Sequence, residues 1–209
     1  MEKRVRKRCA PAERQAQILD EAIRFLGERG YHGFTIQELA GRCSITNGTL
    51  LHYFESKEKL LIAVLAEYGR REGAYLEEFA HGMTREAKLS LSEARKFLRV
   101  VMARTAAQPE LERLCLVLQS EAIGDPTHPA YVFFKNREKT ITEGFTLMLK
   151  PYCEDATALA REIFAMMDGL TLRWLQAEQS FNLTEAWERV EKKLLSRPHT
   201  VKTPAANPK

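Results

Sequence analysis

The residues best suited to contact nucleic acid lie between Thr35 and Lys57. Positions 47–54 hold short polar, aromatic and aliphatic side chains, with no acid among them. This composition is typical of a helix surface that meets phosphates and base edges. Gly48 permits close approach of the backbone, and Lys57 can neutralise a phosphate. The pattern therefore indicates a DNA-binding surface.

Three helices must position this surface. Pro11 suits the first turn of a helix ending at Arg29, and Gly30 is a good terminator. Residues 35–38 read Thr-Ile-Gln-Glu, which has capping-box spacing and predicts a second helix from Thr35 to about residue 42. A connection of about four residues leads to a third helix at 47–54. Two short helices joined in this way, preceded by a longer one, form a helix-turn-helix candidate.

The rest of the chain has helical spacing of apolar residues and no convincing strand pattern. Prolines at 109, 126, 129 and 151 fall at expected joints. We expect an all-α fold of about nine helices, with a three-helix helix-turn-helix domain followed by a C-terminal helical bundle. The expected helices after the third are 57–80, 91–107, 110–123, 127–149, 155–178 and 184–196. The expected domains are a disordered basic arm (1–10), the helix-turn-helix domain (11–56), a C-terminal helical domain (57–196, with 57–80 as connecting helix) and a disordered tail (197–209).

Segment 15–65 resembles the DNA-binding domain of TetR-type (TetR/AcrR-like) transcriptional regulators. The motifs that carry the resemblance are Gly-Tyr-His-Gly-Phe-Thr-Ile at 30–36, Leu-Ala at 39–40, Thr-Asn-Gly-Thr-Leu-Leu-His-Tyr-Phe at 46–54 and Ser-Lys-Glu-Lys-Leu-Leu at 56–61. The resemblance implies that the first three helices bind DNA and that a larger C-terminal bundle binds a small effector and dimerises. The DNA-binding residues expected on this basis are Thr35, Thr46, Asn47, Gly48, Thr49, Leu51, His52, Tyr53 and Lys57.

Three positions depart from the family pattern. Ser44 stands where Gly is usual, so either Ser44 adopts a left-handed backbone or the turn differs. Asn47 replaces a common basic residue, and Leu51 replaces a usual Tyr. Leu51 could contact a thymine methyl group or fill the core against the first helix.

The C-terminal bundle is rich in large and soft apolar side chains. With the resemblance, this composition favours a pocket for a small amphipathic or aromatic effector; the alternative is a plainly packed core. The candidate pocket residues are Arg104, Gln119, Glu121, Phe134, Phe145, Met148, Met167 and Trp174. The last two helices are expected to form a dimer seam. The candidate seam residues are Phe164, Met167, Thr171, Trp174, Trp187, Val190 and Leu194.

Composition narrows the possible functions further. The chain has 209 residues and a net charge of +4, and the first eight residues alone sum to +4. No apolar run approaches 18 residues and no signal peptide is visible, so we expect a cytoplasmic protein without a membrane partner. The four cysteines are dispersed, which favours reduced thiols over a zinc site. No metal site, cofactor or catalytic group is expected.

The sequence therefore predicts a homodimeric, ligand-responsive repressor that binds a palindromic double-stranded operator and is not an enzyme. An alternative is a DNA-binding or architectural protein that a protein partner controls without a small ligand. A second alternative, an enzyme with an incidental helix-turn-helix, would need a nucleophile–base pair that the sequence does not display.

Overall fold

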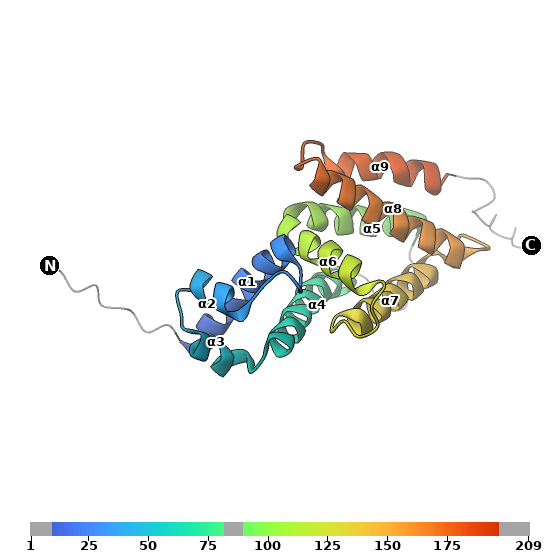
Figure 1. Ribbon diagram of the computed structural model, residues 1–209. Helices are drawn as coiled ribbons and strands as arrows, with labels where there is room; N and C mark the ends of the chain where they lie inside the picture. Colours follow the sequence, from blue (N-terminus) through green and yellow to red (C-terminus); the bar gives the residue numbers. More distant parts are fainter. Residues whose placement is uncertain (1–9, 82–89, 197–209) are drawn as a thin grey trace, which may run out of the picture. The chain divides into compact units, whose positions relative to one another are not determined.

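The computed structural model describes residues 10–81 and 90–196, and its regular structure there is entirely α-helical (Figure 1). This confirms the predicted fold class. The helices are α1 (Pro11–Arg29), α2 (Ile36–Arg42), α3 (Asn47–Phe54), α4 (Lys57–His81), α5 (Leu91–Ala107), α6 (Pro109–Ala122), α7 (Tyr131–Leu149), α8 (Ala156–Gln176) and α9 (Leu183–Leu194). The basic arm at 1–8 and the tail from 197, both of which the sequence predicted to be disordered, lie outside the described residues.

The chain divides into two compact units, and each is described by itself. Unit 1 comprises the described residues up to 72 together with 113–131, and unit 2 comprises 73–112 and the residues from 132 onward. The division differs from the expected boundary at residue 57. The first part of α4 and most of α6 belong with the DNA-binding helices, because side chains of α6 and of the loop after it contact the α1–α2 turn.

Unit 1 is built around the apolar faces of α1 to α4. Ile18 and Leu26 of α1 are fully buried, as are Leu39 of α2 and Leu50 of α3. The predicted capping box starts α2, since the Thr35 hydroxyl accepts from the Glu38 backbone N–H at 3.2 Å and the Glu38 carboxylate accepts from the Thr35 N–H at 3.1 Å. A charged residue also fixes α2 on α1, where the Arg42 guanidinium lies 3.9 Å from the centre of the Phe25 ring.

Unit 2 is a helical core in which α9 packs on both α5 and α8. Its centre holds Trp187, which is fully buried, and Trp174, which is 5% exposed. Glu191 of α9 is also fully buried, and its carboxylate accepts two hydrogen bonds from Arg99 of α5 at 2.7 and 3.2 Å. A buried carboxylate needs such partners because desolvation is costly. The pair therefore fixes the register of α9 against α5.

The start of the seventh helix and the cap of the last helix differ from the sequence-based prediction. The seventh helix begins at Tyr131 rather than 127, because Asp125 forms a turn instead of capping a helix. The Asp125 carboxylate accepts from the Thr127 N–H at 2.9 Å, and His128 Nδ1 accepts from the Ala130 N–H at 3.1 Å. These bonds satisfy the backbone in a non-helical turn. The last helix is capped by Asn182, one residue before Leu183, and not by Thr184.

Candidate nucleic-acid interface

The outer face of α3 is open, as expected for a surface that meets DNA. Asn47, Gly48, Thr49 and His52 are exposed, whereas Leu50 and Phe54 anchor the helix inside unit 1. Leu51 is 39% exposed, so it belongs to the outer face and does not fill the core. An exposed leucine beside polar groups is suited to contact a thymine methyl.

Tyr53 lies at the edge of this face and is half-buried. Its ring meets His52 edge to face, with 5.9 Å between the ring centres. It also lies 6.3 Å from Phe54, which belongs to the core. The orientation of His52 is therefore linked through Tyr53 to the packed side of α3.

The turn before α3 adopts the left-handed backbone that was one of the two expectations for Ser44. Its φ is +54°, and the following Ile45 N–H donates to the Ala40 carbonyl at 3.0 Å. Thr46 then caps α3, with its hydroxyl accepting from the Thr49 N–H at 3.1 Å. Both threonine hydroxyls lie at helix N-termini, where backbone N–H groups favour anions.

The link from α3 to α4 is strained at Glu55. This residue has φ +62° and ψ −47°, and the Ser56 N–H donates back to the Phe54 carbonyl at 2.6 Å. These values describe a γ-turn of the rare type that L-residues adopt only under constraint. Ser56 then caps α4 by accepting from the Lys59 N–H at 3.1 Å. The turn thus fixes the direction in which α4 leaves the recognition helix.

Lys57, the expected phosphate contact, lies against aromatic rings of unit 1. Its ammonium is 4.7 Å from the ring centre of Tyr31 and 4.7 Å from that of Phe34. Burial lowers the pKa of Lys57, while the carboxylate of Glu121 opposes that shift. Cation–π contacts of this kind hold the lysine stem beside the α1–α2 turn.

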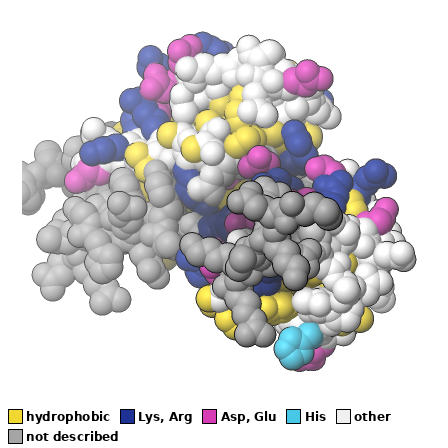
Figure 2. Space-filling model, turned by 90° about the vertical axis from the view of Figure 1, so that its left-hand side faces the viewer, with side chains coloured by type: hydrophobic (Ala, Val, Ile, Leu, Met, Phe, Trp, Pro, Cys, Tyr) yellow, Lys and Arg dark blue, Asp and Glu magenta, His cyan; other side chains and the backbone are white. Residues whose placement is uncertain are grey.

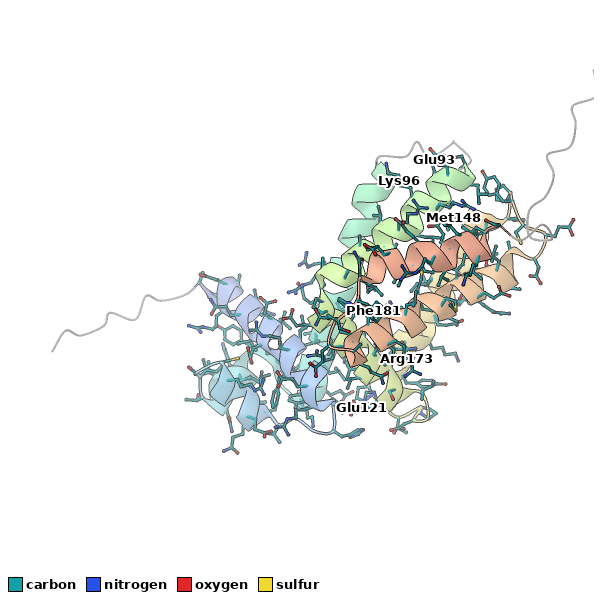
Figure 3. The ribbon with its side chains drawn as sticks, turned by 90° about the horizontal axis from the view of Figure 1, so that it is seen from above. Glu93, Lys96, Glu121, Met148, Arg173 and Phe181 are labelled. Atoms are coloured by element: carbon teal, nitrogen blue, oxygen red, sulfur yellow. The ribbon has the colours of Figure 1, made fainter. Side chains whose placement is uncertain are left out.

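Glu121, at the C-terminal end of α6, is a site residue whose role the sequence did not reveal. Figure 3 labels this side chain. Its carboxylate accepts the Tyr31 backbone N–H at 2.7 Å. Glu121 was expected to line the effector pocket, and in the structure its carboxylate contacts the α1–α2 turn. Nothing in the local sequence connects positions 31 and 121, so only the fold reveals this contact.

His128 closes the same cluster from the loop after α6. Its side chain is fully buried, and its Nε2 lies 3.8 Å from a carboxylate oxygen of Glu121. The ring also meets Tyr31 and His32 edge to face, with centres 5.2 and 5.5 Å apart. Burial lowers the pKa of His128, with the neighbouring His32 acting in the same direction and Glu121 and Asp125 opposing it.

The predicted pocket residues are divided between the two units. Gln119 and Glu121 belong to unit 1, whereas the other six belong to unit 2. Phe145, Met167 and Trp174 are buried in one apolar cluster, and Met148 packs against it. These four side chains form part of the core of unit 2.

The predicted seam residues are also part of that core. Five of the seven are buried, and the other two pack against them. The buried residues are Met167, Thr171, Trp174, Trp187 and Leu194, and the packed ones are Phe164 and Val190. Within one chain the apolar side chains among them already pack against one another. The exposed side of α8 carries Ala165, Met166, Gly169 and Leu172.

Basic and acidic side chains are interspersed on the visible described part of the face in Figure 2, in keeping with a body whose charges balance. No group of three or more His, Cys, Asp or Glu residues suited to a metal ion occurs in the part of the chain that the structure describes. None of the described helices is both long and apolar enough to cross a membrane.

Comparison with known proteins identifies the unit that carries this surface. Residues 18–64 match the model of the family described as bacterial regulatory proteins, tetR family. This part of the chain is therefore a TetR-type DNA-binding domain. The match covers α2 and α3 in full, together with most of α1 and the start of α4.

The similarity to transcriptional regulators extends over most of the chain. The chain is 23% identical over 195 residues to the fatty acid metabolism regulator protein of Bacillus subtilis (strain 168), covering 88% of this chain and 94% of that protein. It is 28% identical over 184 residues to the HTH-type transcriptional regulator BetI of Rhizobium meliloti (strain 1021), covering 84% and 87%.

Solved structures agree on the fold. The fatty acid degradation regulator FadR from Bacillus halodurans superimposes with a TM-score of 0.64 at 21% identity, covering 93% of this chain and 100% of that one. FadR from Bacillus subtilis, in complex with stearoyl-CoA, gives 0.64 at 21% identity, covering 87% and 97%. The chain thus shares the fold of these proteins.

Proposed function

We propose that this TetR-type regulator is a cytoplasmic, ligand-responsive repressor that binds a palindromic operator as a homodimer. The observation that carries the proposal is the outer face of α3, which is exposed and free of acids, in the unit that matches the family. Asn47, Thr49, Leu51 and His52 would contact base edges in the major groove, and Thr35, Thr46 and Lys57 would lie near phosphates.

The proposed effector is an amphipathic molecule with a long apolar part, such as a long-chain acyl thioester. Two relatives are named for fatty acid metabolism or degradation, and one related structure holds stearoyl-CoA. Unit 2 offers a matching environment, because Phe145, Met148, Met167 and Trp174 form one apolar cluster. Methionine-rich surroundings adapt readily to an alkyl chain. The effector would act by binding the DNA-free conformation more tightly than the operator-bound one.

The proposed dimer forms through the exposed face of α8. One exposed side of the helix carries four small or apolar residues at steps of one, three and three positions: Ala165, Met166, Gly169 and Leu172. A Cβ placed on Gly169 would have no neighbour within 4 Å. A two-fold crossing of two α8 helices near Gly169 would bring Met166 against the partner's Leu172. The exposed side of α9 is charged at positions 185, 189, 192 and 193, so α8 supplies the apolar contact.

Operator selection followed by effector titration tests the function. The purified protein is used to select duplexes from a randomised pool, and binding to the selected sequence is measured by fluorescence anisotropy. His52→Ala should weaken specific binding at least tenfold without a change in thermal stability, while Gln176→Ala on α8 serves as a control. Failure to enrich any sequence would contradict DNA recognition.

Stearoyl-CoA is then titrated into the complex, with coenzyme A alone as the control for the headgroup. Release of DNA by stearoyl-CoA and not by coenzyme A supports an effector recognised by its alkyl chain. Release by neither compound would contradict the proposed effector class while leaving DNA binding intact.

A further inference from the structure

The carboxylate of Glu121 occupies a position that leaves no room for a side chain on the α1–α2 turn. A Cβ atom placed on Gly30 would lie 2.2 Å from Glu121 Oε1, well inside contact distance. The other oxygen, Oε2, accepts the Tyr31 N–H at 2.7 Å. The carboxylate is thus seated directly on the turn that precedes the DNA-binding helices.

Two cationic or protonatable side chains from different elements lie around the turn on which this carboxylate sits. Lys57, the first residue of α4, is half-buried over Tyr31 and Phe34 and is attracted by the charge of Glu121. His128, from the loop after α6, directs a buried Nε2 toward Glu121 at 3.8 Å, and this nitrogen has no hydrogen-bond partner among the described residues. The neutral imidazole leaves the negative charge of Glu121 uncancelled on that side.

The placement of Lys57 has an electrostatic cost that Glu121 offsets. A cation in the first turn of a helix opposes the helix dipole, and burial further disfavours its charge. The carboxylate of Glu121 stabilises the ammonium in this position. The same ammonium is the group expected to neutralise a DNA phosphate, and it cannot interact fully with both anions.

We propose that Glu121 sets the affinity of this regulator for DNA by competing with the phosphate backbone for Lys57. This inference rests on the proposed function, since it concerns the strength of the same DNA contact. Because Glu121 lies at the C-terminal end of α6, any shift of that end alters how firmly Lys57 is held. Glu121 therefore acts as a positioning residue for a phosphate contact and does not touch DNA itself.

A double-mutant cycle on the full chain tests the competition. Glu121→Gln keeps an oxygen for the Tyr31 N–H and nearly the same volume but removes the charge. We expect it to strengthen operator binding about three- to fivefold at low salt, in the range measured for partly exposed charge pairs. It should also steepen the salt dependence, by less than about one unit of slope.

The second arm of the cycle is Lys57→Gln. In that background, Glu121→Gln should change affinity by less than about 1.5-fold, because the lysine that links the two charges is gone. Glu154→Gln, which removes one exposed carboxylate from unit 2, controls for the general gain of positive charge. Thermal unfolding of each variant excludes altered folding as the cause.

A DNA-free readout accompanies the cycle. Side-chain NMR of Lys57 should show a lower pKa in Glu121→Gln than in the wild type, because the attraction of the carboxylate is lost. Equal effects of Glu121→Gln with and without Lys57, or an unchanged Lys57 titration, would overturn the inference while the proposed function stands. A wild-type protein that binds no DNA would overturn both.

Discussion

Replacing Gly30 by Ala tests the packing of α6 on the DNA-binding helices. Gly30 has φ +70° and ψ 179°, a conformation that is essentially restricted to glycine and costs an L-residue about 1–3 kcal/mol. The added Cβ would also lie 2.2 Å from Glu121 Oε1, so the carboxylate must withdraw. Withdrawal breaks its hydrogen bond with the Tyr31 N–H, and a bond to a charged group contributes about 1.5–3 kcal/mol.

One effect opposes these losses. Alanine restricts the unfolded chain more than glycine does and thereby stabilises the fold by about 0.4–1 kcal/mol. The net loss expected for Gly30→Ala is therefore about 2–5 kcal/mol of unfolding free energy. In a Glu121→Ala background the clash and the hydrogen bond are both absent, so Gly30→Ala should cost only about 1–2 kcal/mol there.

Urea unfolding followed by far-ultraviolet circular dichroism measures these differences. Gly41→Ala is the matched control, because Gly41 lies within α2 and a Cβ there has no neighbour within 4 Å. That variant should gain about 0.5–1 kcal/mol from helix propensity. A Gly30→Ala midpoint equal to that of the wild type, or an equal cost in both backgrounds, would refute the contact between Glu121 and the turn.

Three further predictions concern other parts of the chain. The lowered pKa of His128 means that the unfolded state binds the proton more readily than the folded state. The stabilisation should therefore be fully present above about pH 6.5 and fall as the pH drops below that value. Between pH 8 and 5 the melting temperature of His128→Asn should change less with pH than that of the wild type, and identical slopes for the two proteins would contradict this role. Glu55→Gly should stabilise the protein by about 1 kcal/mol relative to Glu55→Ala by relieving the positive φ, and chemical unfolding that ranks the two variants in the opposite order would exclude strain. Leu172→Glu should yield monomers in sedimentation with a normal melting temperature, and persistent dimers would argue against the α8 face. Trp174→Arg should instead unfold unit 2, because that side chain is buried in it.

Features determined by neighbouring residues could be predicted from the sequence. The capping box at Thr35 was visible because its two partners are three residues apart, and it predicted where α2 begins. Ser44 in a turn position that usually holds glycine pointed to a left-handed backbone, and its φ of +54° agrees. Local hydrogen bonding and backbone sterics decide such features, so no tertiary information is needed.

Features decided by packing could not be predicted in the same way. An apolar stripe on α8 indicates which residues avoid water, but it does not distinguish the core of one chain from a seam between two. The sequence of Met167 and Trp174 is therefore compatible with an interface, a pocket or a core, and the structure shows that both side chains are buried in the apolar cluster of unit 2. Contacts between distant positions, such as that of Glu121 with Tyr31, leave no periodic signal at all.

The contact of Glu121 with the α1–α2 turn also changes how the DNA-binding unit should be understood. A fragment ending at residue 56 would contain the whole helix-turn-helix, yet it would lack both Glu121 and His128. The Tyr31 N–H would then lose its acceptor, and the rings of Tyr31 and Phe34 would lose Lys57. The carboxylate of Glu121 both accepts the Tyr31 N–H and attracts the ammonium of Lys57. The position of α6 therefore affects the conformation of the α1–α2 turn and the placement of the Lys57 charge together. A displacement that breaks one interaction weakens the other, so α6 does not need to reach α3 in order to alter the affinity for DNA.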